Sequence, residues 1–200
     1  MKKMMALILA LMMVFALAAC GRQKAPAVGG WTPVEDAKMT DDAQSAFDKA
    51  MEGLIGVNYV PVALIGTQLV SGTNFCILCE ASVVSPDAKP YYALVYIYRD
   101  LQGKAEVTNL VKLDIGDIAE RGEIKAAEDA GETLVGGWVV DRESSVEVKG
   151  ALIHLASQVV SGKNHCVLCE GNELVFVYEN LEGKTEVTQR VVIDLGAFNK

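Results

Sequence analysis

The stretch QLVSGTNFCILCE, residues 68–80, returns ninety positions later as QVVSGKNHCVLCE, residues 158–170. In each copy a Ser-Gly pair separates two runs that are rich in β-branched and aromatic residues, a pattern typical of a hairpin turn between strands. Gly72 and Gly162 can take a positive φ angle, which lets the flanking strands meet closely. We therefore expect the same hairpin and the same return strand to be built twice.

The repeat extends well beyond this stretch. VGGW occurs at 28–31 and at 135–138, and LVYIYRDLQGKAEVT at 94–108 corresponds to LVFVYENLEGKTEVT at 174–188. The order of the matches is the same in both halves, but the offset falls from 107 residues at the tryptophans to 90 at the cysteines and 80 at the second turn. The second copy has therefore lost two segments, and the chain contains two structural units.

The first lost segment carries the helical pattern of the first copy, TDDAQSAFDKAMEGLIG at 40–56. Thr40 can cap a helix, and the two aspartates that follow favour its positive end. Apolar residues recur there at the helical period, namely Ala43, Phe47, Ala50, Met51 and Leu54. The second copy has only DRESS, residues 141–145, in this place, which is too short for a helix that could cover a sheet.

The rest of each copy is typical of strands. In the first copy these are residues 59–70 and 73–84 around the Ser-Gly turn, and 91–98 and 105–115 around a Gln-Gly-Lys turn. This order predicts an α+β fold of two units: an antiparallel sheet wrapped on one helix in the first, and a reduced, helix-poor second unit. The second sheet needs cover from a helix in the linker or from the first sheet, and we favour the linker helix.

The first twenty residues have the form of an export signal, with two lysines, an uncharged apolar run and Leu17-Ala18-Ala19-Cys20 at the end. These last four residues resemble the bacterial lipobox, whose cysteine becomes the lipidated first residue of the mature protein. An ordinary signal peptide or an uncleaved anchor helix are the alternatives. We expect a chain that begins at Cys20 and is lipid-anchored at the extracytoplasmic face of the cell membrane.

Charge and length limit the remaining organisation. Setting Lys2 and Lys3 aside leaves 16 of the 18 basic residues against 26 acidic ones, a formal charge of -10. No basic run or basic stripe interleaved with aromatic residues occurs, which argues against a nucleic-acid partner. The expected segments are a tether at 21–28, the first unit at 29–116, a linker at 117–135 and the second unit at 136–200.

Four cysteines follow the expected lipidation site, namely Cys76, Cys79, Cys166 and Cys169. An even number in an exported chain permits disulfides, with three pairings that the sequence does not distinguish. A disulfide within each pair at a bulge, a link between copies such as Cys76 to Cys166, and free thiols that pack in the core are all open.

Alternation along the strand argues against a zinc site. Residues i and i+3 of a strand point to opposite faces. Phe75, Ile77 and Cys79 should therefore share one face, while Cys76 and Leu78 share the other, so the two thiols of a pair do not converge on a metal. We expect no metal site.

Patterns that mark an active site are missing from the sequence. No phosphate-binding glycine loop, nucleophile elbow or His-Glu-x-x-His occurs. His154 and His165 are the only histidines, both at strand positions, and His165 replaces Phe75, which favours a role in packing or at the surface. We therefore expect no enzymatic activity and no cofactor.

The repeated hairpin resembles that of the cystatin family, which inhibits papain-like cysteine proteases. The residues Gln68, Leu69, Val70, Ser71 and Gly72 fit the family's Gln-x-Val-x-Gly hairpin, and Thr73-Asn74-Phe75 continue as its next strand commonly does. The residues Gln158, Val159, Val160, Ser161 and Gly162 fit the same pattern again. Gly29 and Gly30 stand where the N-terminal glycine of the family stands. The resemblance covers 29–116, and 136–200 without the helix.

The resemblance implies a non-covalent wedge made of three segments that enters a protease cleft. The wedge would consist of Gly29 and Gly30, of Gln68 to Gly72, and of Leu101, Gln102 and Gly103, with Gln158 to Gly162 as the equivalent in the second unit. Many cystatins have Pro-Trp at the second hairpin, and its replacement here removes an aromatic anchor worth about 2 kcal/mol. We expect a membrane-anchored inhibitor of papain-like cysteine proteases. The alternative is a non-inhibitory binding or structural lipoprotein in which the motif is only a turn.

Overall fold

The computed structural model describes residues 29–124 and 137–198 of the chain. The expected signal peptide at 1–20, the lipidation site Cys20 and the tether at 21–28 lie outside the described residues, as does the linker from 125 onward. Within the described ranges, no helix is both long and apolar enough to cross a bilayer.

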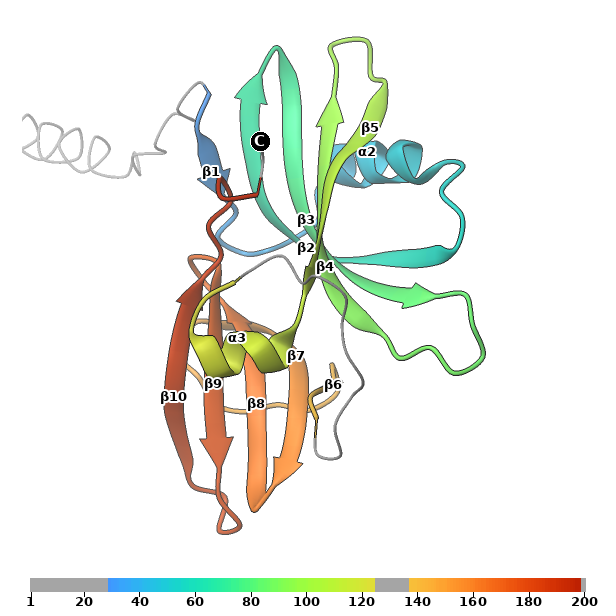
Figure 1. Cartoon of the computed structure of the whole chain (residues 1–200). Helices are drawn as coiled ribbons and strands as arrows, with labels where there is room; N and C mark the ends of the chain where they lie inside the picture. The colour runs from blue at the N-terminus through green and yellow to red at the C-terminus, as the bar shows by residue number, and fades with distance from the viewer. Residues whose placement is uncertain (1–28, 125–136, 199–200) are drawn as a thin grey trace, which may run out of the picture.

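The described chain is mostly β-structure, arranged as two five-stranded antiparallel sheets (Figure 1). The first sheet has the order β1-β2-β3-β4-β5, with β1 (Trp31–Pro33), β2 (Val57–Val70), β3 (Gly72–Val83), β4 (Tyr91–Arg99) and β5 (Ala105–Leu113). The second has the order β6-β7-β8-β9-β10, with β6 (Val139–Val140), β7 (Ala151–Val160), β8 (Gly162–Cys169), β9 (Glu173–Glu179) and β10 (Thr185–Val192). The expected strand order is therefore confirmed in both units.

Strand register repeats as well as strand order. Leu64 of β2 pairs with Ile77 of β3, and ninety residues later His154 of β7 pairs with Val167 of β8. Each of these strand pairs carries two register shifts, at corresponding places. The two hairpins are thus built on the same backbone pattern.

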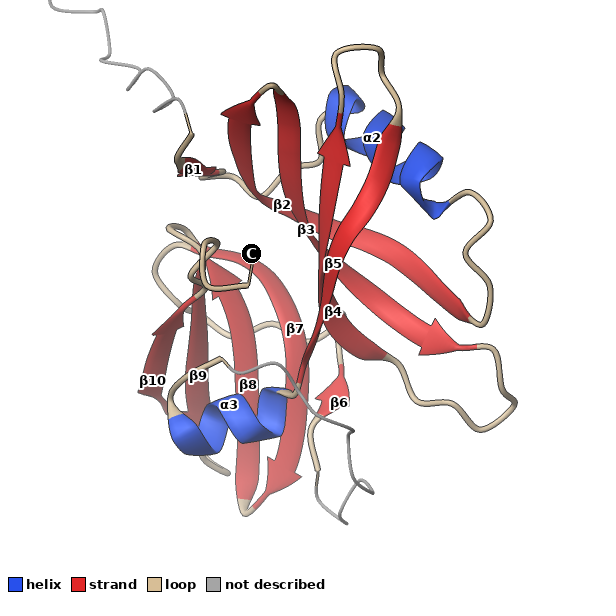
Figure 2. Cartoon of the chain, turned by 45° about the horizontal axis from the view of Figure 1, so that its top comes forward, coloured by secondary structure: helices blue, strands red, loops and turns tan. Residues whose placement is uncertain are grey.

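The expected helix forms as α2 (Asp41–Met51) and packs on one face of the first sheet (Figure 2). Thr40 caps it, since its Oγ1 accepts a hydrogen bond from the Ala43 amide at 3.1 Å. The buried residues between helix and sheet are Ala43, Ala46, Phe47, Ala50, Leu64, Phe75, Ile77, Cys79, Val95 and Ile97. The helix ends at Met51, so Leu54, which the helical pattern included, lies beyond it and is exposed.

The opposite face of the first sheet shares a core with the second sheet. This core includes Ile65 and Leu78 from the first sheet and Leu155 from the second. Buried polar contacts also join the units: Tyr92 Oη donates to the Leu155 carbonyl, and Asn172 Nδ2 donates to the Ile65 carbonyl, both at 2.9 Å. The first sheet therefore covers one face of the second.

A short helix that overlaps the start of the expected linker, α3 (Ile115–Arg121), covers the same face of the second sheet (Figures 1 and 2). It begins two residues earlier than the expected linker, within the expected first unit. Its Ile115 and Ile118 belong to the shared core. Asp114, directly after β5, caps this helix by accepting from the Asp117 amide at 3.0 Å. Both expected sources of cover therefore contribute, but α3 does not stand in for α2, because it lies on the other face.

Residues 141–149, which we call the cover segment, lie over the face of the second sheet that corresponds to the α2 face of the first. Two partly buried valines of this segment, Val146 and Val148, pack against a small cluster of Val167, Cys169, Val175 and Val177. The second unit thus covers this face with a loop, and this loop buries little apolar surface against the sheet.

All four cysteines that the structure describes are free, buried thiols, so neither disulfide alternative is formed. The predicted alternation explains this within each pair. Cys76 lies in the shared core and Cys79 under α2, on opposite faces of β3, and Cys166 and Cys169 divide in the same way. Burial raises the pKa of Cys76 to about 12, which makes its thiol unreactive at neutral pH.

Candidate functional site

The three segments of the predicted wedge lie side by side at one end of the first sheet, where its hairpins turn (Figure 1). The Gly29 amide donates to the Leu69 carbonyl at 3.0 Å, which places the N-terminal segment beside the hairpin tip. On the other side of the tip, Thr73 pairs with Arg99, the last residue before the β4–β5 turn. We call residues 29–30, 68–72 and 100–104 together the first hairpin edge.

The side chain of Gln68 joins two of these segments. Its Nε2 donates to the Gly29 carbonyl at 2.9 Å, and its Oε1 accepts from Asn74 Nδ2 at 2.6 Å. The amide therefore ties the N-terminal segment to both strands of the hairpin, which gives the glutamine of the motif a structural role.

Gly72 allows a close approach at the tip. Its φ angle is +132°, and a Cβ atom here would lie 2.4 Å from the Arg99 carbonyl oxygen and 2.9 Å from Cε2 of Tyr98. The Tyr98 hydroxyl in turn donates to the Ser71 carbonyl at 2.6 Å. The neighbouring strand β4 therefore fixes the path of the tip.

The β4–β5 turn is held by its own first residue. The carboxylate of Asp100 accepts from the Gln102 and Lys104 amides, both at 2.9 Å. Lys49 of α2 donates to the Gly103 carbonyl at 3.0 Å, which links this turn to the helix. Leu101 at its outer end is left 77% exposed.

The first hairpin edge exposes three apolar side chains among polar ones. Leu69 is 46% exposed and Val70 38%, and Leu101 lies beyond them on the neighbouring turn. Apolar side chains on a backbone that is fixed by hydrogen bonds favour a contact surface for another protein. In the described part of the chain, no group of three His, Cys, Asp or Glu side chains is arranged to hold a metal ion.

The second unit has an equivalent edge at the opposite end of the molecule (Figure 1). Asn164 Nδ2 donates to Gln158 Oε1 at 2.8 Å, and the Tyr178 hydroxyl donates to the Ser161 carbonyl at 2.5 Å. We call residues 158–162 and 180–184 the second hairpin edge. The tip contacts are thus repeated, but Gly136, the counterpart of Gly29, lies outside the described residues.

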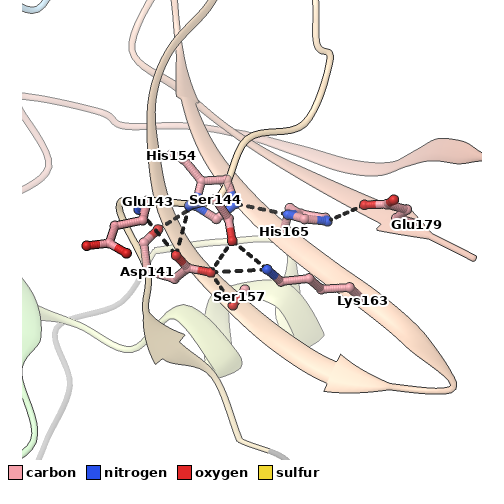
Figure 3. A network of polar contacts seen from close by, with 8 residues as sticks. All are labelled: Asp141, Glu143, Ser144, His154, Ser157, Lys163, His165 and Glu179. Atoms are coloured by element: carbon pink, nitrogen blue, oxygen red, sulfur yellow. Dashed lines mark hydrogen bonds and ion pairs between the residues drawn. The ribbon is translucent and has the colours of Figure 1, made fainter. Parts of the chain in front are cut away.

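A polar network beneath the cover segment was not expected from the sequence (Figure 3). The Asp141 carboxylate accepts from Ser144 Oγ at 2.6 Å, Ser157 Oγ at 2.7 Å and Lys163 Nζ at 3.2 Å. Burial raises the pKa of Asp141, but these hydrogen bonds outweigh it and hold that pKa well below its usual range. Asp141 is therefore an anionic centre that ties the cover segment to β7 and β8.

The two histidines continue this network in a row toward β9 (Figure 3). His154 Nδ1 contacts the Asp141 carbonyl oxygen, and His154 Nε2 lies 2.9 Å from His165 Nδ1. His165 Nε2 lies 3.0 Å from Glu179 Oε2, and the His165 side chain is only 2% exposed. The expected packing role of His165 is thus accompanied by hydrogen bonds at both ring nitrogens.

The sequence did contain a signal for this network. Aligned at the repeat offset, His154 stands in the place of Leu64 and His165 in the place of Phe75, two residues that pack beneath α2. Titratable residues at two core positions of the repeat indicate that the cover over that face has changed. The DRESS segment at 141–145 indicates the loss of a helix, and its first residue is the Asp141 of this network.

Comparison of the chain with protein-family models, with curated proteins and with solved structures found no match. The geometry of the two edges and the resemblance carried by the hairpin residues are therefore the basis for the function.

Proposed function

We propose that this protein is a lipid-anchored, extracytoplasmic inhibitor of papain-like cysteine proteases, and that the first hairpin edge is its binding surface. One observation carries the proposal: segments far apart in the sequence, 29–30, 68–72 and 101–103, meet at a single edge with apolar side chains outward. The cystatin resemblance named these three segments as one wedge. An inhibitory wedge requires these three segments to be adjacent.

The first hairpin edge suits binding without reaction. Hydrogen bonds of Gln68, Tyr98 and Asp100 fix its backbone, so little conformational freedom is lost when a partner binds. Insertion of Leu69 and Val70 into a cleft would bury apolar surface, which favours association. The proposed inhibitor blocks the active site of the protease and forms no covalent bond.

The architecture of the first unit also supports the proposal. A meander of four long strands wraps on α2, with the first hairpin edge at one end, as the resemblance to cystatins implies. The β4–β5 turn presents Leu101 in place of an aromatic anchor. Because such an anchor contributes about 2 kcal/mol, we expect affinity about 30-fold below that of an inhibitor that has one.

A second candidate is a binding or structural lipoprotein without inhibitory activity. The observation that favours it is that the residues of the motif stabilise the hairpin itself. The side chain of Gln68, the carbonyl of Ser71 and the close approach at Gly72 all contribute to the turn. The same contacts recur at the second hairpin edge. On this view the motif builds a turn, and the exposed apolar residues serve another partner.

Inhibition of papain by a soluble form that begins at Gly21 separates the two candidates. Val70→Asp places a charge at the exposed tip of the first hairpin edge and should abolish inhibition. Val160→Asp makes the same change at the second hairpin edge, at the opposite end of the molecule, and serves as the matched control. No inhibition by the parent at micromolar concentration would favour the second candidate. Equal inhibition by both variants would contradict the assignment of the first hairpin edge as the binding surface.

A further inference from the structure

The chain after β10 leaves the second sheet and crosses a face of the first. We call residues 193–198 the C-terminal arm; its Leu195 is buried in the core that the two sheets share. The Tyr96 hydroxyl of β4 donates to the Leu195 carbonyl at 3.3 Å. Farther along, Asn109 Nδ2 of β5 donates to the Phe198 carbonyl. The C-terminal arm thus follows the second unit in sequence but packs on the first (Figure 1).

The absence of a side chain at Gly66 makes room for the C-terminal arm. A Cβ atom on this residue would overlap Cδ1 of Leu195 and would lie 3.2 Å from the Thr32 carbonyl oxygen. Gly66 of β2 pairs with Pro33 of β1. Leu195 therefore lies where the N-terminal strand joins the first sheet.

The C-terminal arm lies next to the side chains that fix the first hairpin edge. Its contacts follow one row of cross-strand partners from β2 to β5, which includes Gly66, Tyr96 and Asn109. The neighbouring row, two residues closer to the tips, consists of Trp31, Gln68, Asn74 and Tyr98. Residues two apart on a strand share a face, so both rows lie on the face that the C-terminal arm crosses. The Trp31 ring also packs edge-to-face on Tyr96, with centroids 5.6 Å apart.

The first unit contributes the equivalent segment to the second. Leu-Asp-Ile-Gly at 113–116 corresponds to Ile-Asp-Leu-Gly at 193–196, at the end of the last strand of each unit. Gly116 packs on Trp138, since a Cβ atom there would lie 3.3 Å from Cδ1 of the indole. Trp138 in turn packs on Phe176 in the same edge-to-face geometry as the equivalent pair of the first unit. Each unit therefore supports the N-terminal strand of the other.

The buried hydrogen bonds between the units are equivalent in the same way. Tyr92 donates to the Leu155 carbonyl, and Asn172, eighty residues after Tyr92, donates to the Ile65 carbonyl, ninety residues before Leu155. The Ile65 carbonyl also accepts from the Val34 amide at 3.0 Å, directly after β1. The second unit and the N-terminal strand thus share this acceptor.

One difference between the exchanged segments concerns how firmly they are held. The hydroxyl of Tyr96 fixes the carbonyl of Leu195, whereas Phe176, the equivalent residue of the second unit, has no hydroxyl. The segment that reaches the first hairpin edge therefore has a hydrogen bond that its counterpart lacks.

We propose that the C-terminal arm positions the N-terminal segment of the first hairpin edge, with Leu195 as a positioning residue that acts through β1. This strand has only three residues and lies at the edge of its sheet. So short a strand has few backbone hydrogen bonds, and the packing behind it determines how firmly it is held. The second unit thus supports the binding surface of the first. The consequence for inhibition rests on the proposed function, whereas the positioning itself does not.

The variants Leu195→Ala and Ile115→Ala, made in the soluble form that begins at Gly21, compare the two exchanged segments. The two residues are equivalent in the repeat and are buried in the shared core, at 5% and 7% exposure. Both changes should therefore destabilise the protein to a similar extent. A loss of overall stability alone predicts the same behaviour for both variants, whereas positioning predicts opposite patterns.

Hydrogen exchange measured by NMR distinguishes these patterns. The chain has only two tryptophans, so their indole N–H signals, assigned with a Trp138→Phe variant, report the two N-terminal strands separately. We expect Leu195→Ala to accelerate exchange at the Trp31 indole and at the Gly29 amide, and to leave the Trp138 indole unchanged. Ile115→Ala should accelerate exchange at the Trp138 indole only.

Inhibition of papain provides the functional measurement. Leu195→Ala should bind papain about tenfold more weakly than the parent, because an N-terminal segment that is no longer held must be ordered on binding. Ile115→Ala should inhibit as the parent does. If the parent does not inhibit papain, the proposed function is wrong, and exchange at Trp31 and Gly29 still decides on the positioning.

Unchanged exchange at Trp31 and Gly29 in Leu195→Ala, or equal weakening of inhibition by the two variants, would overturn the proposal. Should Leu195→Ala fail to fold, Tyr96→Phe takes its place. This change removes the hydrogen bond to the Leu195 carbonyl and copies Phe176 of the second unit. Exchange at the Gly29 amide should accelerate in this variant too, and an unchanged rate would equally overturn the proposal.

Discussion

In the first unit, Leu64 and Phe75 pack beneath a capped helix, whereas in the second unit His154 and His165 stand at the same register positions beneath a loop. The hairpins, the register shifts and the tip contacts are nevertheless the same. A sheet can therefore keep its frame after losing its helix, provided that the positions under the helix find another way to be covered. Here apolar packing was exchanged for a polar network.

The largest expected difference between the units concerns their covers. Phe47→Ala removes the largest buried side chain that α2 contributes to its contact with the first sheet and should lower the free energy of unfolding by about 3–5 kcal/mol. Val146→Ala, the matched change in the cover segment, should cost only about 1 kcal/mol, because that residue is partly exposed. Urea unfolding measures both. Equal losses would break the comparison.

The second prediction concerns the anionic centre of the network. Asp141→Ala removes hydrogen bonds from two serines and a lysine and should cost about 1.5–3 kcal/mol at neutral pH. Because the pKa of Asp141 is lowered, this contribution is present above about pH 4 and is lost as the pH falls further. Urea unfolding at several pH values checks it.

The matched control for Asp141 is Asp42→Ala in the first unit. Asp42 pairs with Arg99 at the start of α2, but its side chain is largely exposed, so solvent screens the pair. We expect little change in stability. A loss comparable to that of Asp141→Ala would mean that both units depend equally on surface charge, contrary to the comparison.

The third prediction concerns what the units share. Gly72→Ala and Gly162→Ala each force a Cβ atom to within 2.4 Å of a backbone carbonyl oxygen, at φ angles of +132° and +126°. Each should cost about 1–3 kcal/mol, and the two costs should be similar, because both tips have the same geometry. Thermal or urea unfolding of the pair of variants measures this. Strongly unequal losses would show that the tips are not equivalent.

The smallest expected effect comes from the tyrosine at each tip. Tyr98→Phe and Tyr178→Phe remove one hydrogen bond each, to the carbonyls of Ser71 and Ser161. We expect a loss of about 0.5–1.5 kcal/mol in both cases, since the tips are exposed and water can replace the donor. Urea unfolding measures both losses. A loss of stability in only one of the two variants would show that the two hairpin edges differ.

The hairpins and the helix could be predicted because local signals specify them. The Ser-Gly turns, the cap at Thr40 and the alternation that separates Cys76 from Cys79 each depend on residues close in sequence. The structure confirms all three. The same alternation explains why neither local disulfide is formed.

The polar network and the position of α3 depend on long-range contacts. His154 and Glu179 become linked through His165 only because β7, β8 and β9 align in one register. The side on which α3 lies depends on the packing of Ile115 and Ile118 against residues far away in the sequence, which no local pattern gives. The internal repeat predicted the structure of the second unit only at positions where both copies carry the same type of residue.

The two hairpin edges give the sharpest remaining comparison. Both present exposed apolar residues, and Leu181 at the second hairpin edge is 85% exposed, more than Leu101 at the first. Exposure alone therefore does not single out the first hairpin edge. Our assignment depends on the N-terminal segment, where Gly29 bonds to Leu69 and Gln68 beside the tip.

Hydrogen exchange of the whole chain with and without papain tests this assignment most directly. We expect slower exchange on addition of papain at residues 29–30, 68–72 and 100–104, and no change at 158–162 or 180–184. Protection confined to the second hairpin edge, or no protection at saturating papain, would contradict the proposal that the first hairpin edge is the binding surface.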